Sequence, residues 1–184
     1  AGASARMRRQ PHARNRRVMY VPTLYVGERY YAPGLPADIT AVDLQARLFS
    51  YLKRQGHELI VKPHPECATG IRPELAAIGN ARIETRLFDQ VADEADVLLF
   101  DCPSSTTFRT AVCSDKPIVL LEHGRVPITE HAFSLIKRRA AVVMTGRTDA
   151  NRIEVDWDAL DRAIVEAAEL RDPSFANLYF GAGL

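Results

Sequence analysis

The feature that most constrains this chain is a series of short apolar runs, each separated from the next by a helical pattern. The runs are four to six residues long, a usual length for strands buried on both faces. Parallel strands need a crossover between them, and the crossover helices then cover the sheet. The sequence therefore predicts an α/β fold, a Rossmann-like doubly wound parallel sheet of about six strands. We expect the strands at residues 18–21, 58–61, 82–85, 96–101, 117–121 and 141–145.

The segments between the runs carry helix signals. In the first of them Leu44, Leu48 and Leu52 fall on one helical face, and Gly56 is placed to end the helix. Asp38 or Thr40 can cap its start. We expect helices at residues 38–55, 73–78, 88–95, 104–114, 129–139 and 156–171.

Composition limits the class of protein. The chain has 184 residues, of which 47% are hydrophobic, and its formal net charge is +1. A chain of this length can bury one hydrophobic core. The low net charge argues against a general nucleic-acid binder, which would be strongly basic. The apolar runs are too short to cross a bilayer. Cys67, Cys102 and Cys113 have no CxxC spacing, which argues against a disulfide framework or a four-ligand zinc site and favours the cytosol.

The chain divides into an arm and a domain. Residues 1–17 contain six arginines and no acidic residue. Two interpretations of this arm stay open: a disordered linker at a domain edge, or an arm that contacts anionic lipid or polymer. Residues 18–184 form the predicted domain.

One predicted strand ends in an unusual pair of prolines. The run 58–61 is followed by Lys62-Pro63-His64-Pro65, and ligands of doubly wound sheets bind at the carboxyl ends of strands. The prolines restrict the backbone around His64, so the imidazole lies on a stiff turn and can donate a hydrogen bond to a phosphate oxygen. The alternative is a surface histidine in a strand-to-loop turn.

A second strand end is rich in hydroxyl groups. Asp101-Cys102-Pro103-Ser104-Ser105-Thr106-Thr107 lies between a predicted strand and a helix. Hydroxyl and N–H groups at a helix start can bind a diphosphate, so Ser104, Ser105 and Thr106 are candidate phosphate ligands. Helix capping alone explains one or two of these hydroxyls. If the two strand ends are neighbours in the sheet, His64 and Ser104 face one crevice.

Three further residues are candidates for contacts to the ribose, the base or the donor. Glu122 follows a predicted strand and is either a ribose ligand or an exposed loop carboxylate. Arg109 lies one turn into the helix and either contacts phosphate or belongs to a solvated helix face. Arg29 lies in a long loop, residues 22–36, that either closes over a donor or packs as an ordinary loop.

Several catalytic motifs are absent from the sequence. There is no HExxH, GxSxG, GxGxxG or P-loop lysine motif. The sequence therefore gives no support for metal-dependent or serine-hydrolase chemistry, and we expect no metal and no cofactor beyond a nucleotide-activated substrate.

The order VMYVPTLY, then ELIVKPHP, then ADVLLFDCPSSTTFRTAVCSDKPIVLLEHG resembles the C-terminal, donor-binding half of GT-B fold transferases. The chain is most similar to the CDP-glycerol glycerophosphotransferases of teichoic-acid synthesis and to capsule-polysaccharide transferases, over residues 18–124. In that family the histidine of the HP pair and the serines of the Ser-Ser element contact the donor phosphates. The resemblance implies these roles for His64, Ser104 and Ser105, with Thr106 adjacent and His64 also catalytic.

The resemblance also implies properties of the whole enzyme. The substrate is a CDP- or UDP-linked donor, and the acceptor binds to an N-terminal domain that is missing from this chain, so the isolated domain binds donor but turns over poorly. The enzyme is cytoplasmic and works at the inner face of the membrane, where the full protein can associate peripherally; no nucleic-acid partner is expected. Tyr25 replaces a basic residue common in the family, so phosphate contact from the first loop depends on Arg29. The alternatives are a non-catalytic nucleotide- or protein-binding module and a sugar-nucleotide epimerase domain.

Overall fold

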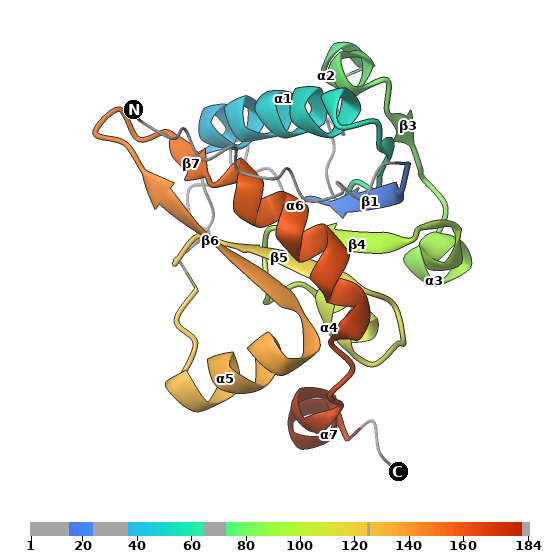
Figure 1. Ribbon diagram of the computed structural model, residues 1–184, viewed down its shortest axis with the longest axis vertical. Helices are drawn as coiled ribbons and strands as arrows, with labels where there is room; N and C mark the ends of the chain where they lie inside the picture. Colours follow the sequence, from blue (N-terminus) through green and yellow to red (C-terminus); the bar gives the residue numbers. More distant parts are fainter. Residues whose placement is uncertain (1–14, 24–36, 65–72, 125, 182–184) are drawn as a thin grey trace, which may run out of the picture.

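The computed structural model describes residues 15–23, 37–64, 73–124 and 126–181. Among these residues a seven-stranded sheet, in the order β3-β2-β1-β4-β5-β6-β7, forms the centre of the molecule (Figure 1). The strands are β1 (Arg17–Val21), β2 (Glu58–Val61), β3 (Arg82–Ile83), β4 (Val97–Phe100), β5 (Ile118–Glu122), β6 (Ala141–Arg147) and β7 (Ile153–Val155).

Helices connect and cover these strands. They are α1 (Asp38–Arg54), α2 (Pro73–Gly79), α3 (Phe88–Val91), α4 (Thr106–Val112), α5 (Glu130–Arg139), α6 (Trp157–Glu166) and α7 (Ser174–Phe180), with 3₁₀ turns η1 (Ala92–Glu94) and η2 (Ala167–Glu169).

The first six strands pair in parallel, which confirms the predicted Rossmann-like sheet. From β1 the chain moves outward through β2 to β3, then returns to the other side of β1 to form β4. The order therefore reverses between β1 and β4, and ligands of such sheets bind outside the strand ends at this switch point. The seventh strand, β7, was not among the predicted strands. It pairs antiparallel with β6 through Thr145 and Val155.

Side chains from both faces of the sheet are buried. On β1, Val18 and Tyr20 pack on the side of α1 and α6, while Met19 and Val21 pack on the side of α4 and α5. Alternation along a strand explains this division. A strand covered on both faces reads as a continuous apolar run, which is why the sequence predicts these strands.

Hydroxyl and carboxylate caps begin three of the helices. Ser105, Thr129 and Asp156 accept hydrogen bonds from the backbone N–H of the residue three positions on. The predicted cap of α1 is wrong, because Ala37 occupies the cap position and forms no side-chain bond. Gly56 does follow the end of α1, with a φ of 84° that favours glycine.

The last helix, α7, was not expected from the sequence. Its Phe175 and Ala176 are buried, and it packs against α4 and α5. No helix in the described ranges is both long and apolar enough to cross a membrane.

Candidate functional site

The carboxyl ends of β1, β2 and β4 enclose a cavity of about 260 Å³, which we call the crevice pocket. Its position matches the switch point of the sheet, because β2 and β4 flank β1. Proteins commonly bind small ligands in cavities of roughly 300–1,000 Å³, so the described walls hold a phosphate or diphosphate more readily than a whole nucleotide. The lining residues are Val21, Pro22, Thr23, Lys62, Pro63, His64, Thr85, Arg86, Leu87, Phe88, Cys102, Ser104, Ser105 and Thr107.

The crevice pocket brings the two predicted strand-end motifs together. His64, half-buried after β2, and Ser104 and Ser105, after β4, line the same hollow although they lie on opposite sides of β1. The predicted shared crevice is confirmed. That these residues contact a phosphate stays a prediction.

The hydroxyl groups of this segment have different surroundings. Ser105 Oγ accepts a hydrogen bond from Phe108 N at 3.1 Å and so caps α4. Capping uses a lone pair, so the hydroxyl proton can still donate to a ligand. Ser104 Oγ lies 3.2 Å from Cys102 Sγ. Thr106 is the exposed first residue of α4 and does not line the pocket, whereas Thr107 does.

A buried carboxylate after β4 forms hydrogen bonds to β1 and to the segment that follows β1. Asp101 accepts hydrogen bonds from Tyr20 Oη at 2.5 Å and from Thr23 N at 2.6 Å. Burial raises the pKa of Asp101 to about 6, although these two donors act to lower it. Because Thr23 lines the crevice pocket, Asp101 positions one of its walls.

Two basic side chains that the sequence analysis did not single out also line the pocket. Arg86 donates from its backbone N–H and from Nε to the buried Glu84, and its guanidinium also pairs with Glu94. These bonds lower the pKa of Glu84 to about 2. Lys62 is buried, and its Nζ donates to the carbonyl oxygen of Pro63 at 3.2 Å.

Glu122 lies at the end of β5 and is buried rather than exposed. Its Oε1 accepts a hydrogen bond from Gly124 N at 2.6 Å, while Oε2 is buried and has no partner among the described residues. The next residue, His123, bonds Thr145 Oγ1 through Nδ1 at 2.8 Å, and burial lowers its pKa to about 4. Glu122 is not among the residues that line the crevice pocket, so its hydrogen bond to a ribose hydroxyl stays a prediction.

Of the two remaining candidates, Arg109 is not among the described residues that line the crevice pocket. Arg109 is exposed, and its guanidinium lies 4.6 Å from the ring centroid of Phe180, in a cation–π contact with α7. Arg29 and the rest of its loop lie outside the described residues.

The sequence did hold a signal for Lys62, because a lysine directly follows the apolar strand and precedes Pro63 and His64. For Asp101 the signal was weaker. Its partner Tyr20 is 81 positions away in the sequence, and only the pairing of β1 with β4 brings the two together.

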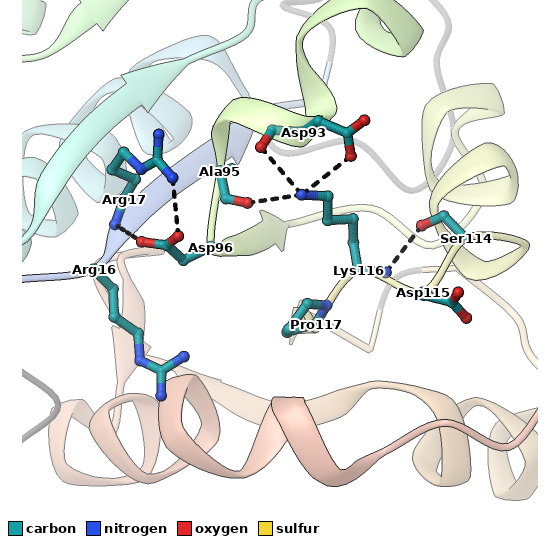
Figure 2. Close-up of a pocket in the computed structure, with 9 residues that line it drawn as sticks. All are labelled: Arg16, Arg17, Asp93, Ala95, Asp96, Ser114, Asp115, Lys116 and Pro117. Atoms are coloured by element: carbon teal, nitrogen blue, oxygen red, sulfur yellow. Dashed lines mark hydrogen bonds and ion pairs between the residues drawn. The ribbon is translucent and has the colours of Figure 1, made fainter.

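A second and larger hollow, of about 910 Å³, lies at the opposite, amino end of the sheet. We call it the amino-end hollow, and Figure 2 shows how its charges pair: Arg17 bonds Asp96, and Lys116 bonds Asp93. Lys116 also donates to backbone carbonyls. Its lining residues are Arg16, Arg17, Asp93, Ala95, Asp96, Ser114, Asp115, Lys116 and Pro117.

The described residues form no cluster of metal ligands. None of their histidine, cysteine, aspartate and glutamate side chains form a group of three or more that could hold a metal ion.

Comparisons with known proteins find likeness in structure alone. The sequence matches no protein-family model and no curated protein. Similar solved structures include the spinosyn forosaminyltransferase SpnP, with 18% identity over 89% of this chain and 37% of that chain, at a TM-score of 0.45. The glycotransferase of kitacinnamycin has 19% identity over 99% of this chain and 42% of that chain, at a TM-score of 0.43. The glycosyltransferase SnogD from Streptomyces nogalater has 16% identity over 100% of this chain and 47% of that chain, at a TM-score of 0.47.

The chain spans less than half the length of each of these three structures. All three are named as transferases, but likeness at these TM-scores carries no argument about the chemistry of this chain.

Proposed function

We propose that this chain is the nucleotide-donor-binding domain of a GT-B glycosyltransferase or glycerophosphotransferase, one that builds a cell-surface polysaccharide or a teichoic-acid-like polymer. One observation carries the proposal: His64 and the Ser104-Ser105 pair line the same pocket at the switch point of a doubly wound sheet. The sequence around both motifs resembles the donor-binding half of these transferases.

In this function the crevice pocket binds the donor phosphates. His64 and the hydroxyls of Ser104 and Ser105 donate hydrogen bonds to phosphate oxygens, and Glu122 accepts one from a ribose hydroxyl. An acceptor hydroxyl, bound to another domain, displaces the nucleotide from its activated carbon or phosphorus. Hydrogen-bond donors already aimed at the leaving phosphate stabilise its developing charge without a metal ion, and removing one such donor typically costs about 3–4 kcal/mol of barrier.

Nucleotide titration tests this proposal. CMP, CDP, UDP and UDP-sugars are titrated into the 184-residue chain by calorimetry, and at least one of them is expected to bind. His64→Ala and Ser104→Ala should each weaken that binding about 10- to 100-fold, because hydrogen bonds to charged groups contribute about 1.5–3 kcal/mol. His131→Ala is the matched control, since His131 is exposed on α5 and does not line the pocket.

Ser105 needs a different design because it also caps α4. Ser105→Asn keeps a capping acceptor, whereas Ser105→Ala removes it at a cost of about 1 kcal/mol in stability. A domain that ignores every nucleotide would refute the donor-binding function and favour a module that binds protein.

A further inference from the structure

Lys62 is a buried cation, and among the described residues no opposite charge lies at contact distance from it. Lys62 is only 5% exposed. An ammonium group has three donors, and within the described part of the chain Nζ uses one, toward Pro63 O. That acceptor is a neutral carbonyl of the neighbouring residue. No described carboxylate forms an ion pair with Nζ.

Burying such a charge is unfavourable. Transfer of an ammonium group out of water costs several kcal/mol unless a counter-charge and hydrogen bonds compensate for the lost solvation. Desolvation accordingly lowers the pKa of Lys62, and the more distant Glu84 offsets this only in part.

Glu84 is already engaged by two arginines. Arg82 Nη1 lies 2.9 Å from Glu84 Oε2, and Arg86 bonds both carboxylate oxygens. The guanidinium of Arg86, which also lines the crevice pocket, is thus neutralised by carboxylates, whereas no described carboxylate pairs with Lys62. The pocket therefore keeps one positive charge, at Lys62, that has no counter-charge in the described residues.

We propose that Lys62 is the counter-charge for an anionic ligand group, a phosphate or diphosphate bound between Lys62, His64 and Ser104. These three residues line one cavity, which is large enough for such a group. The inference deepens the proposed function and rests on it for the location of the site. It adds Lys62 as a binding residue and specifies that the site selects a negatively charged group. A neutral ligand of the same shape would leave the ammonium group buried and unpaired.

Binding of charged and uncharged probes tests this role. Inorganic pyrophosphate, CDP, UDP, cytidine and uridine are titrated into the wild-type chain and into Lys62→Met, Lys62→Arg and Lys53→Met. Lys62→Met keeps the side-chain length but not the charge, and Lys62→Arg restores the charge. Lys53 is the matched control, because it also donates to a backbone carbonyl but is exposed on α1.

The expected result is a loss confined to anions. Lys62→Met should bind pyrophosphate and nucleoside diphosphates about 10- to 100-fold more weakly, with no change for the nucleosides. Lys62→Arg should recover much of the affinity, and Lys53→Met should bind as the wild type does. A purely structural lysine would weaken charged and uncharged probes alike.

A measurement on the wild type keeps the test valid if Lys62→Met does not fold. The chain has only four lysines, at positions 53, 62, 116 and 137, so lysine side-chain NMR gives four signals, and Lys62→Arg assigns one. Pyrophosphate should shift the Lys62 signal more than the other three.

The outcomes separate the two proposals. If Lys62→Met binds nucleotide with an affinity within about twofold of the wild type, and the Lys62 signal does not shift, this inference is overturned. The donor-binding function would then still stand. Lys62-dependent binding of pyrophosphate without any nucleotide binding supports the anion site and refutes the donor function. Binding of neither probe overturns both.

Discussion

The two ends of the sheet differ in how their charges are paired. In the amino-end hollow, Arg17 pairs with Asp96 and Lys116 with Asp93. The crevice pocket at the carboxyl end is less than a third as large, yet it is lined by Lys62, whose charge is not paired by any described carboxylate. The size of a hollow therefore does not identify the functional end of this molecule. A buried group that the described residues leave unsatisfied is the better indicator.

Two buried cations, one from each end, show the difference most clearly. Arg139, at the end of α5, is 2% exposed, and its guanidinium donates to the carbonyl oxygens of five residues. Four of these carbonyls lie at the end of α4 and in the segment before β5, and the fifth follows η2. The carbonyls satisfy the donors of Arg139, and Arg139 satisfies the carbonyls. They belong to Ala111, Val112, Ser114, Lys116 and Leu170. Within the described ranges, Lys62 has one such bond.

The largest expected effect follows from this contrast. Arg139→Met should lower the free energy of unfolding by about 3–5 kcal/mol, because it leaves several buried carbonyls without a donor. Lys62→Met should change it by less than about 1 kcal/mol, or raise it, because the variant removes an uncompensated buried charge. Urea unfolding at pH 7 measures both values.

Neighbouring residues supply the controls for that comparison. Arg138 lies on the same helix but is exposed and pairs with Asp172, so Arg138→Met should cost less than about 1 kcal/mol. Equal losses from Arg139→Met and Lys62→Met would show that both cations are structural, and the contrast between the two ends would disappear.

A second prediction uses pH. The pKa of Asp101 is about 6 in the folded chain, against an ordinary value of 3.8. The folded state therefore holds this proton more tightly than the unfolded state does. Its contribution to stability is complete below pH 3.8 and is lost as the pH rises through 6, a change of roughly 3 kcal/mol. Asp101→Asn cannot titrate, so its stability relative to the wild type should increase by most of that amount between pH 4 and 7.

The amino end supplies the control with the opposite sign. Hydrogen bonds from the backbone and side chain of Arg17 lower the pKa of Asp96, so this group contributes stability above its ordinary pKa that is lost as the pH falls. Relative to the wild type, Asp96→Asn should lose stability as the pH rises from acid toward 7. Urea unfolding across this range gives both slopes, and a flat difference for Asp101→Asn would contradict the assigned burial of its charge.

The sequence predicted the parallel core well for a physical reason. Strands such as Val97–Phe100 are buried on both faces and read as unbroken apolar runs. β7 gives no such signal, because it has three residues, sits at the edge of the sheet and alternates buried and exposed side chains. The helix α7 buries only Phe175 and Ala176, too few for a clear periodicity.

The site was predictable where topology alone decides the position. His64 and Ser104 follow parallel strands, and the carboxyl ends of parallel strands meet at one edge of the sheet. The charge balance of the site was not predictable. Whether Glu84 neutralises Arg86 or Lys62 depends on side-chain geometry between β2 and the segment after β3, and the spacing of residues does not contain that information.

The smallest expected effect concerns the ion pair of the amino-end hollow. Arg17 Nη2 lies 3.2 Å from Asp96 Oδ1, and both side chains are more than a third exposed. Solvent screening reduces such a pair to about 0.2–1 kcal/mol. A double-mutant cycle with Arg17→Met and Asp96→Asn isolates it, because the asparagine still accepts the hydrogen bond that the backbone N–H of residue 17 donates to Asp96 Oδ2. The coupling measured by urea unfolding should fall further in 1 M salt, where the Debye length is about 3 Å. A salt-independent coupling above about 2 kcal/mol would contradict this, because it would mean that the pair is effectively buried.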